Sequence, residues 1–136
     1  MQRLSLVLAL VLFFAACSPG GSGDATATES GLEITHLVEG DGEHPTASST
    51  VEVHYHGTLE DGSVFDSSVD RGRPASFPLN RVIDCWTEGV QLMKVGGKAK
   101  LVCPPEIAYG ARGTPGGPIP ENATLTFEVE LLKIVQ

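Results

Sequence analysis

The strongest constraint on the fold is a regular alternation of apolar and polar residues that recurs along much of the chain. Residues 50–59, TVEVHYHGTL, put every second side chain from Val51 to Tyr55 on an apolar face and polar side chains opposite. Successive side chains of a strand point to opposite faces, so the pattern predicts a half-buried β-strand. Residues 99–103 and 125–131 repeat the alternation. These three segments therefore predict a sheet that buries one face.

Two shorter signals predict further strands. Residues 32–38 alternate with one shift of register, which is typical of a strand that contains an irregularity. The pair Asp61-Gly62 is a strong hairpin signal, so Val64 and Phe65 are expected to return on the strand that follows residues 50–59.

Only one segment has helical spacing, residues 77–97, FPLNRVIDCWTEGVQLMKVGG. Asp84 is expected to be the N-cap, and Gly96-Gly97 is expected to stop the helix. The apolar residues at steps of three and four are Ile83, Trp86, Val90 and Met93. The predicted fold class is therefore α+β, an antiparallel sheet with one short helix across it.

The first residues read as a targeting segment and not as part of the fold. An apolar run extends from Leu6 to Cys17, which is too short for a typical membrane span and ends in small residues, as a secretory signal does. The letters FAAC resemble a bacterial lipobox, in which the cysteine, here Cys17, is lipidated. An ordinary signal peptide or an uncleaved anchor are the alternatives. The predicted organisation is a signal peptide at 1–16, a lipidated Cys17 with a flexible tether to residue 30, and one domain at 31–136.

Charge and motifs exclude several classes of function. The chain has 17 acidic residues against 9 Lys and Arg, a net charge of -8, so it lacks the basic surface of a nucleic-acid-binding protein. His54 and His56 share one strand face, but two ligands without a third are a weak metal site, and solvated histidines are the simpler interpretation. Ser67 and Ser68 lack the sequence context of a catalytic nucleophile. No metal is expected.

Two cysteines remain once Cys17 is assigned to lipidation. Cys85 and Cys103 would lie in an exported protein, where disulfides persist. They either form a disulfide or remain two buried thiols, and the sequence leaves both open. A redox function is not expected, because the chain has no C-x-x-C motif.

The aromatic residues outside the targeting segment come from different predicted elements. A shared core is the simplest interpretation, but tyrosine and tryptophan need polar partners when they are buried. Asp66 follows Phe65 directly and places a carboxylate among these rings. An aromatic cavity with a few polar groups is typical of a binding site. The six residues are Tyr55, Phe65, Phe77, Trp86, Tyr109 and Phe127.

Four long stretches, in this order, resemble the FKBP-type peptidyl-prolyl cis-trans isomerases: VEVHYHGTLEDGSVFDSSVDRG, RVIDCWTEGVQLMKVGGKAKL, PPEIAYGARG and IPENATLTFEVELL. The resemblance extends from about Gly31 to the C-terminus. It implies a curved antiparallel sheet wrapped around one short α-helix, in agreement with the pattern of the residues themselves.

The resemblance also implies a substrate pocket with Trp86 at its floor. Asp66 matches the family's pocket acid, and Arg71 and Tyr55 match its hydrogen-bonding partners. The backbone N–H of Ile83 and the hydroxyl of Tyr109 match the groups that bind substrate carbonyls, so Asp66, Tyr109 and Ile83 are the implied catalytic groups. The implied walls are Tyr55, Phe65, Phe77, Val82, Ile83, Tyr109, Ile119 and Phe127.

The function that this resemblance implies is isomerisation of X–Pro bonds in exported or periplasmic polypeptides, without a cofactor. The implied partners are proline-containing polypeptides, and FK506-like macrocycles as inhibitors. The chain is expected to be a monomer, held by its lipid on a bacterial membrane with the domain in the periplasm or at the cell surface. An FKBP-like binding or chaperone module with incidental turnover is the alternative, and a lipoprotein without a working pocket is a remoter one.

Overall fold

The computed structural model describes residues 25–135. The predicted signal peptide and Cys17 lie outside these residues. Within the described part of the chain, no helix is both long enough and apolar enough to span a membrane.

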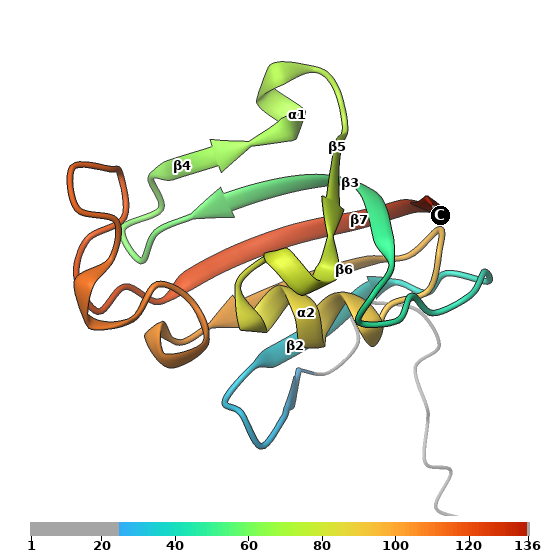
Figure 1. Cartoon of the computed structure of the whole chain (residues 1–136), viewed down its shortest axis with the longest axis horizontal. Helices are drawn as coiled ribbons and strands as arrows, with labels where there is room; N and C mark the ends of the chain where they lie inside the picture. Colours follow the sequence, from blue (N-terminus) through green and yellow to red (C-terminus); the bar gives the residue numbers. More distant parts are fainter. Residues whose placement is uncertain (1–24, 136) are drawn as a thin grey trace, which may run out of the picture.

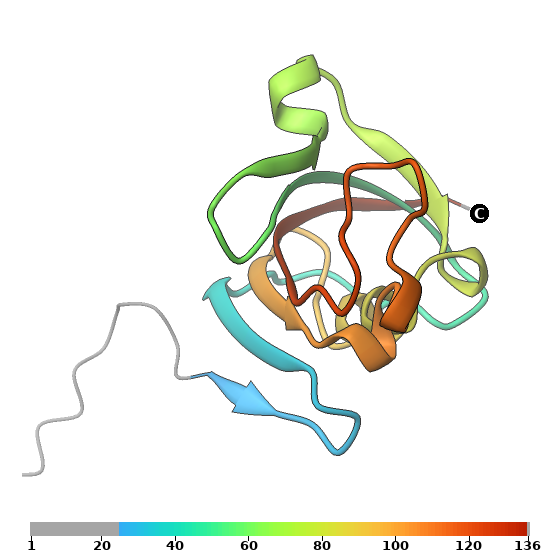
Figure 2. The ribbon, with the colours of Figure 1, turned by 90° about the vertical axis from the view of Figure 1, so that its left-hand side faces the viewer.

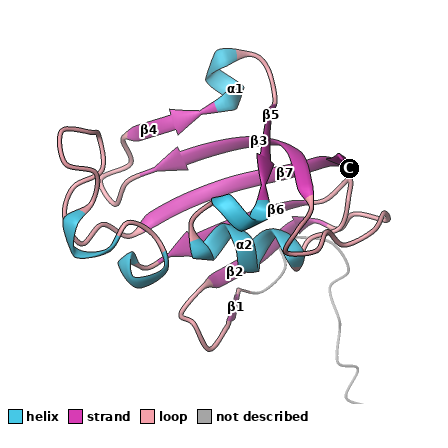
Figure 3. Ribbon diagram, viewed as in Figure 1, coloured by secondary structure: helices cyan, strands magenta, loops and turns pink. Residues whose placement is uncertain are grey.

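Residues 25–135 form one seven-stranded antiparallel sheet, with one main helix, α2, packed across its concave face (Figures 1 and 3). The predicted α+β class is therefore confirmed. The strands are β1 (Thr26–Ala27), β2 (Glu33–Val38), β3 (Thr50–Thr58), β4 (Val64–Ser67), β5 (Ala75–Pro78), β6 (Lys98–Cys103) and β7 (Leu125–Val135). The helices are α1 (Ser68–Arg71), α2 (Asp84–Gln91) and the 3₁₀ turns η1 (Leu79–Arg81), η2 (Pro105–Ile107) and η3 (Gly110–Arg112).

Strand β3 organises the sheet, whose order is β1-β2-β6-β7-β3-β4. One edge of β3 pairs with β7 along its whole length. Its other edge pairs first with β5, where Val51 faces Phe77, and then with β4, where Gly57 faces Asp66. The two short strands therefore diverge from one long strand, as Figure 1 shows.

The alternation predicted from the sequence is confirmed along the central strands. In β3, every second residue from Val51 to Gly57 is buried, and the residues between them are partly exposed. The same pattern holds in β6 and in β7, where the side chains from Leu125 to Leu131 alternate between the core and solvent. The buried face packs against α2, which contributes Trp86 and Val90 to the core.

A disulfide between Cys85 and Cys103, whose Cα atoms are 5.8 Å apart, links helix α2 covalently to the sheet. Both cysteines are fully buried. The sequence left a disulfide and two free thiols open, and the structure has the disulfide. It joins the first turn of α2 to the last residue of β6, so the start of the helix is held over the centre of the sheet.

The predicted helix boundaries need correction. Asp84 is the first helical residue, and Ile83 is the N-cap, with no side-chain hydrogen bond at that position. The carbonyl of Ile83 already accepts bonds from the backbone of Trp86 and Thr87. The helix ends at Gln91, well before Gly96, so Met93 is buried beyond the helix and not on its face.

The structure also contains elements that the sequence patterns did not predict. Thr26–Ala27 pairs with β2, within the range that was assigned to a flexible tether. Its short length explains why no alternation was visible there. Strand β5 lies inside the segment read as the approach to the helix, and it is formed by pairing with the first half of β3.

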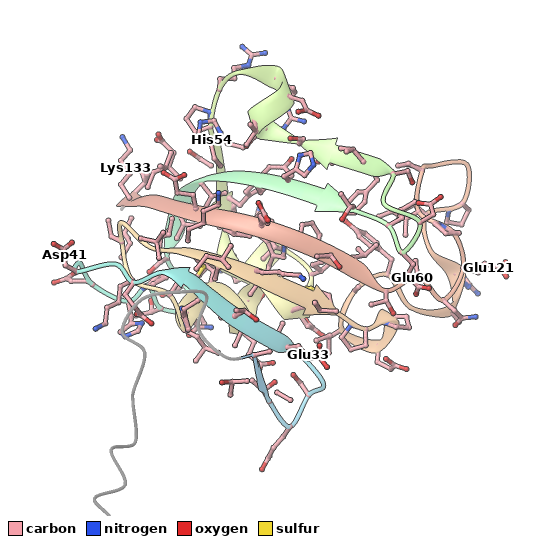
Figure 4. All side chains as sticks on the ribbon, turned by 180° about the vertical axis from the view of Figure 1, so that it is seen from behind. Glu33, Asp41, His54, Glu60, Glu121 and Lys133 are labelled. Atoms are coloured by element: carbon pink, nitrogen blue, oxygen red, sulfur yellow. A yellow bond between two sulfur atoms is a disulfide. The ribbon has the colours of Figure 1, made fainter. Side chains whose placement is uncertain are left out.

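The convex face of the sheet carries polar and charged side chains, among them Glu33, His54 and Lys133 (Figure 4). Lys133 forms a salt bridge of 3.3 Å with Glu52. His54 and its neighbour on this face, His56, contact serine hydroxyl groups at 3.0 and 2.9 Å. In residues 25–135, no group of three or more His, Cys, Asp or Glu side chains is arranged to hold a metal ion.

Candidate active site

A short motif that follows β4 positions Arg71 beside the acidic residue of the site, Asp66. The hydroxyl of Ser67 caps α1 by accepting a hydrogen bond from the Asp70 N–H at 3.1 Å. Gly72 ends α1 in the left-handed region, with φ of 76°, where a residue without a Cβ is favoured. The turn between these two caps carries Arg71, which forms a salt bridge with Asp66.

Ser68 fixes this motif to the sheet. Its side chain is fully buried, accepts a hydrogen bond from the backbone N–H of Tyr55 at 2.8 Å, and contacts the ring of His54 at 3.0 Å. The serine that lacked the context of a nucleophile thus has a structural role, which is to hold α1 against β3 beside Tyr55.

Polar contacts at the edge of the aromatic cluster join three side chains, each to the other two. The three residues are Asp66, Tyr55 and Arg71. The Tyr55 hydroxyl donates to Asp66 at 2.5 Å, and Arg71 donates to the Tyr55 oxygen at 3.0 Å. Arg71 also forms a salt bridge with Asp66, and its guanidinium lies 5.7 Å from the centre of the Tyr55 ring. The carboxylate is therefore compensated although it stands beside aromatic rings, as the resemblance implied.

These contacts set the protonation states of the two acids. Burial raises the pKa of the Tyr55 hydroxyl, and its hydrogen bond to the Asp66 carboxylate raises it further. Burial alone would also raise the pKa of Asp66, but the hydrogen bonds from Tyr55 and Arg71 and the charge of Arg71 outweigh it, so that pKa lies below its usual range. At neutral pH, Asp66 is ionised and Tyr55 keeps its proton.

Trp86 is the centre of the aromatic cluster. Its ring makes edge-to-face contacts with Tyr55 and Phe127 at 5.3 Å between centroids, and with Phe77 at 5.5 Å. Such pairs are each worth about 0.5–1.5 kcal/mol beyond the area that they bury. The indole ring is thereby held in one orientation by rings from β3, β5 and β7. Its N–H is buried without an acceptor among the residues that the structure describes.

Gly57 makes room for the outer part of the cluster. A Cβ at this position would lie 2.6 Å from the ring of Phe65 and 3.1 Å from that of Phe127. These two rings pack edge to face at 5.5 Å. A glycine in β3 therefore lets the ring of Phe65 approach the strand closely, where it forms one wall of the site.

The site also contains two hydrogen-bond donors, on Ile83 and Tyr109. Ile83 precedes α2 in an extended conformation, with φ of -60° and ψ of 151°. Within residues 25–135, neither the backbone N–H of Ile83 nor the hydroxyl of Tyr109 has a hydrogen-bonding partner. Tyr109 is 42% exposed and comes from the long loop between β6 and β7, which Figure 2 shows folded across the end of the sheet. Both donors are free to bind a carbonyl group.

Together these groups line a cavity of about 400 Å³. The predicted residues that it brings together are Tyr55, Phe65, Asp66, Phe77, Val82, Ile83, Trp86, Tyr109 and Phe127. Arg71 supports the cavity through Asp66 and Tyr55 but does not line it.

One predicted wall residue is corrected by the structure, and one lining residue was missed. Ile119 is buried in the core and is not among the residues that line the cavity. Its backbone forms hydrogen bonds with Thr114 that close the loop. Arg81 lines the cavity and was not predicted. Its place directly before Val82 and Ile83 was the only signal in the sequence that could have indicated it.

Comparison with known proteins identifies the family of the chain. The sequence model for the FKBP-type peptidyl-prolyl cis-trans isomerases matches residues 41–132. The FKBP-type peptidyl-prolyl cis-trans isomerase FkpA of Aeromonas hydrophila is 58% identical over 108 residues, which cover 79% of this chain and 40% of that protein. FK506-binding protein 1A of Emericella nidulans is 56% identical over 109 residues, covering 76% of this chain and 98% of that protein.

The solved structures agree with the sequence comparison. The crystal structure of FkpA from Escherichia coli has a TM-score of 0.77 and 52% sequence identity, covering 81% of this chain and 51% of that one. The chain thus spans about half the length of several bacterial relatives that it matches. The family match covers most of the described domain and every segment that contributes to the cavity. The chain therefore belongs to the family of the FKBP-type peptidyl-prolyl cis-trans isomerases.

Proposed function

We propose that the chain is a peptidyl-prolyl cis-trans isomerase that acts on X–Pro bonds of exported proteins. The observation that carries the proposal is the cavity itself, which combines a fixed tryptophan floor and aromatic walls with two free donors, the Ile83 N–H and the Tyr109 hydroxyl. A prolyl ring is apolar and suits this floor. The carbonyls beside it are acceptors for the two donors.

The mechanism follows from the electronic structure of the amide bond. Rotation about it meets a barrier of roughly 18–20 kcal/mol, because resonance stabilises the planar form. The planar amide is more dipolar than the twisted one, so a cavity with little water disfavours the planar ground state relative to the twisted transition state. Each 1.36 kcal/mol of such differential stabilisation accelerates rotation by about tenfold.

Orientation adds to desolvation. Donors held at Ile83 and Tyr109 bind the flanking carbonyls while Trp86 supports the ring, so rotation is confined to one bond. This chemistry forms no covalent intermediate and requires no cofactor. In this proposal, Asp66 organises the cavity by keeping Tyr55 and Arg71 in place.

A proline-isomerisation assay on the purified chain tests the proposal. The uncatalysed reaction takes about 10–100 s at 25 °C, so catalysis is measured as acceleration of cis-to-trans conversion in peptides with an apolar residue before proline. FK506 is expected to inhibit by occupying the cavity. A folded sample that binds these peptides but leaves the rate at its uncatalysed value would falsify the enzyme proposal in favour of a binding module.

We also propose that Cys17 is lipidated and anchors the domain to a bacterial membrane, so that the domain acts in the periplasm or at the cell surface. The apolar run before Cys17 and the letters FAAC support this proposal. Cells fed radiolabelled palmitate are expected to label the wild-type protein, and Cys17→Ser is expected to lose the label. A wild-type protein without label contradicts lipid anchoring.

A further inference from the structure

The lining of the cavity includes a positively charged side chain, that of Arg81, which has no role in the proposed rotation mechanism. Arg81 is the last residue of η1, lies directly before Val82 and Ile83, and lines the cavity with them. Its side chain is exposed to solvent. The residue therefore stands at the mouth of the cavity, two positions from the free N–H of Ile83.

The charge of Arg81 is not neutralised by its surroundings. The other ionised group of the lining, Asp66, is already paired with Arg71. No salt bridge or side-chain hydrogen bond of Arg81 occurs in the part of the chain that the structure describes, including any with the nearby exposed Asp84. The mouth of the cavity thus has one uncompensated positive charge, on a chain whose net charge is -8.

We propose that Arg81 is a specificity-determining residue that favours X–Pro substrates with a carboxylate on the residue directly after the proline, over substrates with its neutral isostere. Arg81 lines the same cavity as Ile83 and lies two residues before it, so a substrate whose carbonyl binds the Ile83 N–H would place its neighbouring side chains near the arginine. A guanidinium binds carboxylates with two parallel hydrogen bonds, which a neutral amide does not match. This inference rests on the proposed function, because it concerns substrates of the same cavity.

The expected effect is modest, because the arginine is exposed. Exposed ion pairs contribute about 0.2–1 kcal/mol, which corresponds to a preference of up to about fivefold for an acidic peptide over its neutral isostere. Added salt screens such a pair, so the preference is expected to decline between low salt and about 0.5 M.

The test compares two matched peptides on the full chain, both with an apolar residue before the proline and with either Glu or Gln directly after it. Binding is followed by the fluorescence of Trp86, the single tryptophan of the chain, and turnover is followed as kcat/KM. The variants are Arg81→Gln and the charge reversal Arg81→Glu. Arg112→Gln is the matched control, because Arg112 is exposed, ends η3 as Arg81 ends η1, and does not line the cavity.

The wild type and Arg112→Gln are expected to prefer the Glu peptide by about two- to fivefold. Arg81→Gln should bring that ratio to about one, and Arg81→Glu should bring it below one. A ratio of one in the wild type, or a ratio that Arg81→Gln leaves unchanged, overturns the proposal. If Arg81→Gln lowers binding or kcat/KM equally for the Glu and the Gln peptide, the proposal is also overturned, because the arginine would then act on a group that both peptides share.

The two readouts separate this inference from the proposed function. An Arg81-dependent preference in binding without any turnover supports the role of Arg81 and contradicts the isomerase. Turnover of both peptides without dependence on Arg81 contradicts the inference alone. Failure of every peptide to bind contradicts both.

Discussion

The contacts of Asp66 explain how single residues keep a carboxylate stable beside aromatic rings. An unpaired buried charge is very costly, but Asp66 is about half exposed and has Tyr55 and Arg71 as partners. Because the side chain remains 45% exposed, water screens the pair and its contribution to stability is limited. The main effect of the contacts is to fix the Tyr55 ring, which packs against Trp86.

The lowered pKa of Asp66 predicts a pH dependence of stability. A carboxyl group whose pKa is lower in the folded state stabilises the fold above its unfolded pKa of about 3.9, and this contribution disappears as the pH falls through the folded pKa. We therefore expect the stability difference between the wild type and Asp66→Asn to be constant from pH 7 to about 5 and to shrink in more acidic solution. Urea unfolding at several pH values measures it. A difference that grows on acidification contradicts this account.

Tyr109 offers a test of hydrogen bonding to substrate, because its ring is exposed and its hydroxyl has no partner among the described residues. Tyr109→Phe removes one oxygen and creates no cavity. A neutral hydrogen bond contributes roughly 0.5–1.5 kcal/mol, so kcat/KM is expected to fall by up to about tenfold while the denaturation midpoint stays the same. Unchanged kcat/KM in a folded variant would show that the apolar walls and the Ile83 N–H suffice.

At the scale of elements, α2 determines where the floor and one donor of the cavity lie. The helix has only eight residues, too few to be stable alone. Its position depends on the disulfide from Cys85 to β6 and on the hydroxyl of Thr87, which donates to the Leu79 carbonyl at 2.6 Å. Both attachments lie within one residue of Trp86.

Removing the disulfide is therefore expected to affect both stability and the cavity. Closing a loop with a sequence separation of 18 contributes about 3 kcal/mol by the chain-entropy relation. The double variant Cys85→Ala/Cys103→Ala should lose a similar free energy of unfolding, measured by denaturant titration. Wild-type protein under a reductant serves as the second condition. A double variant as stable as the oxidised wild type would mean that packing alone holds α2 in place.

At the scale of the whole molecule, the cavity exists only because distant segments meet. Its lining comes from β3, β4, β5, β7, η1, α2 and two loops, and no pair of neighbouring elements forms it alone. A ligand that fills the cavity contacts all of these segments, so its binding is coupled to global unfolding and not to a local motion.

This coupling predicts stabilisation by an FK506-like macrocycle. A ligand that binds only the folded state at about one hundred times its Kd adds about 2.7 kcal/mol to the free energy of unfolding. The midpoint of thermal unfolding is expected to rise with ligand concentration as one cooperative transition. Trp86→Ala, which should lose about 3–5 kcal/mol of stability by opening a large void, is expected to show no such rise. A wild-type midpoint that does not respond to the macrocycle contradicts binding in this cavity.

The sequence by itself determined the features that depend on near neighbours. Alternation over a few residues predicted which faces of β3, β6 and β7 are buried, because strand geometry requires it whatever the partner strand is. The hairpin after β3 followed from Asp61-Gly62 for the same local reason. The long stretches shared with the family predicted nine of the residues that line the cavity.

Only the tertiary structure decided the features that depend on long-range pairing and on the course of loops. Strand β5 forms because β3 offers it a free edge, and its own sequence has no strand pattern. Ile119, whose backbone is hydrogen-bonded to Thr114, lies in the core, whereas Arg81, which precedes α2, lines the cavity. The direction in which a loop side chain points depends on packing between segments far apart in the chain, and no local pattern of residues encodes it.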